Sequence, residues 1–87
     1  MRLTVISPER AVFDGDVDAV VAPAYDGEVG ILPRHAPFMT LLGSGRLTIR
    51  SGGETRTVWV EGGFLQVVND VVRVVAEHAR EETDHAS

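Results

Sequence analysis

Apolar and polar positions alternate along most of the chain in short runs, which is typical of β-strands and not of helices. The clearest run is Arg46–Ser51, where Leu47 and Ile49 fall on one face and arginine and threonine fall on the other. Gly-Gly, Asn-Asp and Gly-Ser-Gly turn signals separate the runs at short intervals. This pattern predicts an all-β sandwich or barrel.

The period-two pattern also predicts the core, because side chains of alternate strand residues share one face. The residues expected to form much of it are Leu47, Ile49, Val58, Val60, Leu65, Val67, Val72 and Val74. Trp59 has the opposite parity to its two valine neighbours. We therefore expect its side chain to point away from the core, partly exposed or covered by a partner.

Two stretches interrupt the strand pattern. Residues 26–38, "DGEVGILPRHAPF", combine two glycines, two prolines and several charged residues, a density that predicts a loop. Asp14–Asp16 also has the composition of a turn. The polar end "HAREETDHAS" lacks an apolar face, and a helix of about ten such residues is marginal in water. We expect a β-sandwich domain over residues 1–77 and a frayed or disordered tail over residues 78–87.

Composition narrows the function. The 87 residues carry a formal charge of −5 and no cysteine, and all eight basic residues are arginine. An acidic chain with few aromatic residues is unsuited to nucleic acid. The chain has no lysine, which biotinyl and lipoyl carrier domains need as the attachment site of the cofactor, so it is not one of these domains. No apolar run approaches the ~20 residues of a membrane helix, so a soluble, cytoplasmic protein is expected.

Candidate chemistry is sparse. His35 is either a loop histidine bonded to backbone or an interface contact, and the other two histidines fall in the polar tail. Asp26 and Glu28 could suggest paired carboxylates, but those work across a cleft for which a chain this short has little room. Ser44 has no nucleophile-elbow context. We expect no catalytic residue, no metal site and no cofactor.

Four segments carry a family resemblance. "GEVGILPRHAPF" resembles the signature of the epsilon subunit of F-type ATP synthases, usually close to "GELGILPGHAPL". "SPERAVFDGDVDAVVAP", "TLLGSGRLTIR" and "VEGGFLQVVNDVVRVVAEHA" resemble other segments of that family, in the family's order and spacing. The resemblance extends over residues 3–79.

The resemblance implies a ten-stranded β-sandwich of two five-stranded sheets. It also implies a non-catalytic rotor subunit on the central stalk, which links the gamma subunit to the membrane c-ring and couples proton translocation to ATP synthesis. The implied location is peripheral, on the cytoplasmic face of the bacterial inner membrane, and the membrane is reached only through the complex. The positions carried over are Glu28, Gly27 and Gly30 for the c-ring interface and Ser7, His35 and Thr40 for the gamma interface.

Two departures from the family pattern affect these expectations. Arg34 stands where the family often has glycine; either it takes a costly positive φ, or the loop adjusts, or it gains an ion pair at the interface. Most members also continue into a C-terminal helical hairpin, which is not expected here; hairpin-mediated inhibition and ATP binding by this chain alone are then not expected either. The alternative is a small β-sandwich adaptor module of another complex.

Overall fold

The computed structural model describes residues 1–82, and these residues form strands and turns without a helix. The expected all-β class is therefore confirmed. The strands are β1 (Arg2–Ile6), β2 (Ala11–Asp16), β3 (Ala19–Ala24), β4 (Gly27–Ile31), β5 (Phe38–Leu41), β6 (Ser44–Ser51), β7 (Glu54–Val68) and β8 (Val71–Glu82).

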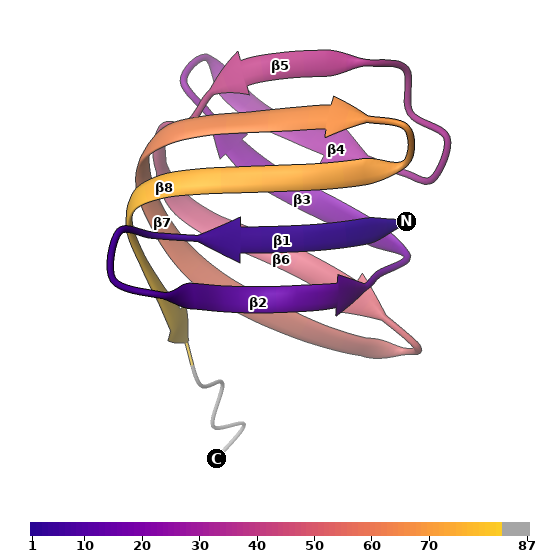
Figure 1. Cartoon of the computed structure of the whole chain (residues 1–87), viewed down its shortest axis with the longest axis horizontal. Helices are drawn as coiled ribbons and strands as arrows, with labels where there is room; N and C mark the ends of the chain where they lie inside the picture. The colour runs from indigo at the N-terminus through magenta and orange to yellow at the C-terminus, as the bar shows by residue number, and fades with distance from the viewer. Residues whose placement is uncertain (83–87) are drawn as a thin grey trace.

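One continuous sheet, in the order β2-β1-β8-β7-β6-β3-β4 with β5 added to β7, folds over into two layers (Figure 1). The long strands β7 and β8 bend together near Gly62 and Gly63, where the pairing skips from Glu61↔His78 to Gly63↔Ala76. Each therefore contributes its two halves to different layers. Layer one holds β2, β1, the first half of β8, the second half of β7, and β5; layer two holds β4, β3, β6 and the remaining halves.

The predicted count of ten strands is not confirmed, since residues 1–82 contain eight. The difference comes from the bend. The two glycines were expected to separate two strands, but both lie within β7 at positive φ and Gly63 keeps its pairing with β8, so that one long strand crosses from layer to layer. Counting each half of β7 and β8 separately gives five segments in each layer.

The core lies between the layers and is made of aliphatic side chains from every strand except β2 and β5. All eight predicted core residues are at most 1% exposed, which confirms the parity argument. No polar side chain of residues 1–82 is buried. Trp59 is half-buried and its Nε1 donates to Glu61 Oε2 at 2.8 Å, so it points outward as predicted.

Part of the stretch predicted as a loop is a strand. Gly27–Ile31 form β4, which pairs with all but the first residue of β3 through a hairpin turn at Tyr25 and Asp26. The loop is confined to residues 32–37. The prediction was wrong here because it relied on the low β propensity of these residues. The hydrogen bonds to the partner strand β3 outweigh that low propensity. Asp14–Asp16 were likewise expected to turn, but they belong to β2 and pair with β1.

The expected boundary at residue 77 is also wrong. Strand β8 continues to Glu82, and His78–Glu82 pair with Thr57–Glu61. The polar composition is tolerated because this edge segment has one face in water. Two ion pairs, Arg46–Glu82 at 2.9 Å and Arg56–Glu81 at 3.3 Å, join the segment to β6 and β7. The rest of the predicted tail, residues 83–87, lies outside the described residues.

Candidate protein interface

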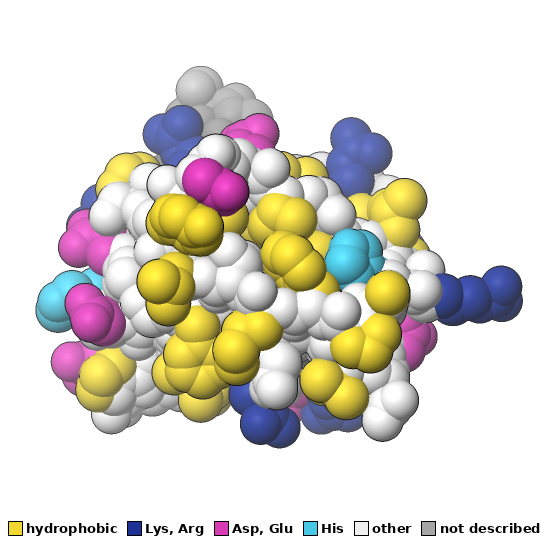
Figure 2. All heavy atoms as spheres, turned by 90° about the horizontal axis from the view of Figure 1, so that it is seen from above, with side chains coloured by type: hydrophobic (Ala, Val, Ile, Leu, Met, Phe, Trp, Pro, Cys, Tyr) yellow, Lys and Arg dark blue, Asp and Glu magenta, His cyan; other side chains and the backbone are white. Residues whose placement is uncertain are grey.

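The two strands β4 and β5 form neighbouring open edges of the two layers, along the top of the molecule in Figure 1. A shallow groove of about 670 Å³ lies there. Its lining residues are Ala24, Tyr25, Asp26, Glu28, Val29, Phe38, Met39, Thr40, Leu41 and Phe64. Figure 2 shows this side of the molecule, with hydrophobic side chains and one histidine across its middle and most charged side chains toward its margins.

An apolar row crosses the outer face of layer one beside this groove. Strand register places Ile6 opposite Val75, Val75 opposite Phe64, and Phe64 opposite Leu41. These four residues, which we call the apolar row, span three inter-strand steps, or about 14 Å. Leu41 is 61% exposed and Ile6 is 38% exposed. Met39 and Val68, 59% and 41% exposed, extend the apolar surface along the strands.

An outward apolar row is unusual in a free β-sandwich, whose outer faces are normally polar. Contiguous exposed apolar surface of this kind marks interaction sites more often than isolated exposed side chains do. We therefore take the apolar row and the adjoining groove as the candidate interface.

The structure places the predicted gamma-facing residues around this surface, but not together. Ser7 follows Ile6 directly, at one end of the apolar row, where its hydroxyl donates to the Arg10 carbonyl at 3.3 Å. Thr40 precedes Leu41 on β5, but it pairs with the buried Leu65, so its side chain faces away from the apolar row and lines the groove instead. His35 lies in the β4–β5 loop, at the opposite end of the sandwich from the β1–β2 turn that carries Ser7 (Figure 1).

His35 is held by its own loop. Its Nδ1 is 2.7 Å from the Ala36 carbonyl oxygen, and its ring packs edge-on against Phe38 with 5.6 Å between centroids. The backbone-bonded alternative is thus realised in the geometry. The same contacts leave the ring half-buried and fixed in direction, so they are compatible with a contact to a partner.

The predicted c-ring residues share strand β4. Glu28 is exposed and lies opposite Pro23, two residues after the turn that Tyr25 and Asp26 make. Gly27 has φ 131, a conformation that only glycine adopts without strain, so the hairpin itself requires it. Gly30 has no such φ, and a Cβ there would meet nothing within 4 Å. The chain by itself gives Gly30 no structural reason to be glycine.

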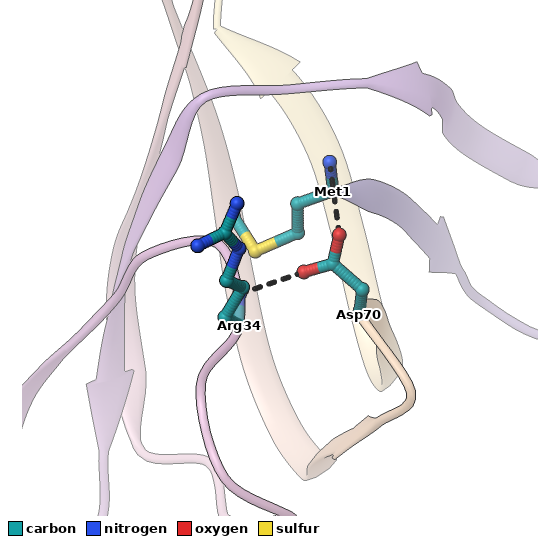
Figure 3. Close-up of polar contacts among 3 residues, drawn as sticks. All are labelled: Met1, Arg34 and Asp70. Carbon is teal, nitrogen blue, oxygen red and sulfur yellow. Dashed lines mark hydrogen bonds and ion pairs between the residues drawn. The ribbon is translucent and has the colours of Figure 1, made fainter.

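Arg34 takes the costly alternative and keeps a left-handed backbone, with φ 67. This conformation costs a non-glycine residue about 1–2 kcal/mol. The backbone N–H of Arg34 donates to Asp70 Oδ1 at 2.9 Å, across the end of the sandwich (Figure 3). This hydrogen bond lowers the pKa of the Asp70 carboxyl below its usual value, against an opposing effect of desolvation, and the N-terminal amine adds to the lowering.

Sequence reasoning named three single residues for the gamma interface and missed the apolar row. A signal was available in the strands at 64–68 and 71–77. The first is apolar at most positions of both parities and the second keeps two valines, at 71 and 75, on its outward parity, whereas a half-exposed strand should alternate. The register that aligns the four residues across β1, β8, β7 and β5 could not be read from those runs separately.

Two other features are absent from the described part of the chain. Residues 1–82 contain no group of three or more histidine, cysteine, aspartate or glutamate side chains arranged to hold a metal ion. Within the same residues there is no helix that is long and apolar enough to cross a membrane.

Comparison with known proteins gives one consistent answer. A family model described as the beta-sandwich domain of the ATP synthase Delta/Epsilon chain matches residues 1–82. The ATP synthase epsilon chain of Caulobacter vibrioides is 41% identical over 81 residues, covering 93% of this chain and 94% of the relative. That of Desulforamulus reducens is 47% identical over 78 residues, covering 90% of this chain and 59% of the relative, so the chain spans only part of that protein.

Solved structures agree. A chain in the Euglena gracilis mitochondrial ATP synthase (OSCP/F1/c-ring) matches with a TM-score of 0.85 and 27% identity over 95% of this chain and 55% of that one. A chain in the central stalk/c-ring structure of the Tetrahymena thermophila enzyme matches with a TM-score of 0.80, covering 100% of this chain and 73% of that one, and at 16% identity it shows the fold alone. The family match and the curated relatives together show that this chain belongs to the ATP synthase delta/epsilon chain family, with residues 1–82 as its β-sandwich domain.

Proposed function

We propose that this chain is a non-catalytic rotor subunit of the central stalk of an F-type ATP synthase, which links the gamma subunit to the c-ring. The observation that carries the proposal is the apolar row on the outer face of layer one. It has the composition of the core of a protein interface, where charged residues are depleted. The matching solved structures are of an OSCP/F1/c-ring assembly and of a central stalk with its c-ring, which supports the choice of partners.

The apolar row and the adjoining β5 edge form the gamma-facing surface in this proposal. Ser7 lies at the β1 end of the apolar row, Thr40 lies on the β5 edge and lines the groove, and His35 extends the contact to the β4–β5 loop. A surface this wide on a rigid sheet resists rotation of one subunit against another better than a single anchoring side chain would. Such resistance is what a rotor needs to pass torque without slip.

The β3–β4 hairpin supplies the c-ring contact. Its turn carries Tyr25, 68% exposed, and the exposed carboxylate of Asp26, and the start of β4 adds the exposed carboxylate of Glu28. A rigid two-residue turn loses little conformational entropy on docking. Gly30, which has open space around it, leaves room for partner backbone to approach closely. The chain would then lie peripherally on the cytoplasmic face of the bacterial inner membrane, coupling proton translocation to ATP synthesis.

A binding experiment with matched charge insertions tests the gamma contact. Leu41→Asp places a charge in the apolar row, and Thr55→Asp places the same charge at an exposed strand position of layer two. Purified gamma subunit should bind the natural chain and Thr55→Asp alike. It should bind Leu41→Asp at least about 30-fold more weakly, because an unpaired charge buried at an interface costs about 2 kcal/mol or more.

Equal binding by both variants would show that gamma docks elsewhere on the domain. Failure of the natural chain to bind gamma at all would favour the adaptor of another complex. Circular dichroism of both variants checks that each one folds, so that lost binding is not mistaken for lost structure.

A further inference from the structure

Asp70 connects three segments at one end of the sandwich. It is the second residue of the two-residue turn between β7 and β8, where Val68 pairs with Val71. Its Oδ1 accepts the Arg34 N–H at 2.9 Å, and its Oδ2 lies 3.5 Å from the N-terminal amine of Met1 (Figure 3). Its carbonyl oxygen accepts the Arg2 N–H at 3.1 Å. One exposed residue thus joins the start of β1, the β7–β8 turn and the β4–β5 loop.

The backbone at these contacts is strained. Asn69, Asp70 and Arg34 have φ of 51, 63 and 67. A two-residue hairpin turn with positive φ at both positions has its lowest energy with glycine at the second position. Aspartate at that position keeps the strain and gains a carboxylate that glycine lacks. The turn therefore retains a less favourable residue whose side chain reaches another loop.

The loop that receives this contact is the one that presents His35. The His35 N–H donates to the Leu32 carbonyl at 3.2 Å, which closes the loop one residue after the left-handed Arg34. Holding the Arg34 amide therefore fixes the direction in which His35 and its packing partner Phe38 face. If the Arg34 N–H lost its acceptor, a right-handed backbone at Arg34 would become competitive and would turn the histidine away.

We propose that Asp70 is a positioning residue, which holds the Leu32–Pro37 loop in the conformation that the partner binds. The inference rests on the proposed gamma contact and adds to it the residue that prepares the loop. Ordering a loop before association removes part of the entropy cost of binding. The contribution of Asp70 is then made to affinity more than to the stability of the fold.

Three variants separate this role from a turn effect. Asp70→Gly relieves the turn and removes the acceptor; Asp70→Asn keeps an acceptor oxygen of the same shape; Asn69→Gly relieves the same turn without touching Arg34. Amide hydrogen exchange on the free chain and the Kd for purified gamma are measured for each. Asp70→Gly should accelerate exchange of the Arg34 amide about tenfold or more and raise the Kd about tenfold.

Asn69→Gly should leave the exchange rate and the Kd unchanged. Asp70→Asn keeps the acceptor oxygen, so both quantities should stay much closer to those of the natural chain than in Asp70→Gly. Arg34→Gly provides a further check, because glycine takes positive φ without help. In that background Asp70→Gly should change the Kd less than about threefold. An Arg34 amide that exchanges at the natural rate in Asp70→Gly would overturn the proposal, as would a Kd unchanged in that variant. If the natural chain fails to bind gamma, the proposed function fails, and the exchange measurement still decides whether Asp70 holds the loop.

Discussion

Among the glycines of residues 1–82, Gly63 leaves the least room for a side chain, and a comparison with Gly62 and Gly30 tests the consequence. Gly63 has φ 98, and a Cβ built on it would lie 1.9 Å from the Val75 carbonyl oxygen and 2.9 Å from the Ala76 Cα. Both contacts are backbone atoms of the paired strand β8, so no side-chain rotation relieves them. Gly63→Ala must therefore separate β7 from β8 at the bend that joins the two layers.

The magnitude follows from two contributions. Positive φ costs alanine about 1–2 kcal/mol, and displacing the packed backbone of the neighbouring strand at this half-buried site adds about 1–3 kcal/mol. The sum, about 2–5 kcal/mol, is a large part of the roughly 4–13 kcal/mol expected for a domain of 87 residues. We expect Gly63→Ala to unfold at much lower urea concentration, or to fail to fold.

Two glycine variants serve as graded controls. A Cβ at Gly62 would lie 2.5 Å from the Glu77 side chain, which is exposed and can move, so only the cost of φ 65 remains and we expect a loss of about 1–2 kcal/mol. Gly30→Ala meets nothing within 4 Å and should stay within about 0.5 kcal/mol of the natural chain. Urea unfolding followed by far-ultraviolet circular dichroism gives all three values. The reasoning is refuted if Gly63→Ala is no less stable than Gly62→Ala.

Three further outcomes follow. Ending the chain after Glu77 removes the segment that pairs with Thr57–Glu61 and should cost about 2–4 kcal/mol in urea unfolding, through lost strand hydrogen bonds; a smaller loss than about 1 kcal/mol would mean that this pairing is weak. Because the pKa of Asp70 is lowered in the folded chain, its carboxylate stabilises the fold above the ordinary carboxyl pKa near 4. This stabilisation is lost as the pH falls through the lowered pKa. Stability should therefore fall less steeply below pH 4 in Asp70→Asn than in the natural chain, and parallel pH profiles would contradict the Arg34 contact. Glu28→Ala should leave the stability of the free chain within about 0.5 kcal/mol and reduce proton-driven ATP synthesis in reconstituted vesicles; normal coupling would remove Glu28 from the c-ring contact.

The sequence by itself determined the fold class and the core. Period-two alternation at 46–51 and 55–61 placed Leu47 and Val58 inside and Trp59 outside, because side chains of adjacent strand residues must point to opposite faces. The family was also legible, since four motifs kept their order and spacing, and the family match confirms it. These properties are local, or depend only on the order of segments along the chain.

Pairing between distant segments decided the rest. The composition of Gly27–Ile31 predicted a loop, and that of His78–Glu82 predicted a tail. Each segment is a strand only because it forms hydrogen bonds with a neighbouring strand. The apolar row exists because register across four strands aligns residues from positions 6, 41, 64 and 75. The left-handed Arg34 finds its acceptor 36 residues away, on a turn that only the folded sandwich brings to it. Strand propensity is a property of single residues, whereas register and long-range contact depend on the whole packed sheet, and this is why tertiary structure was needed for the candidate interface.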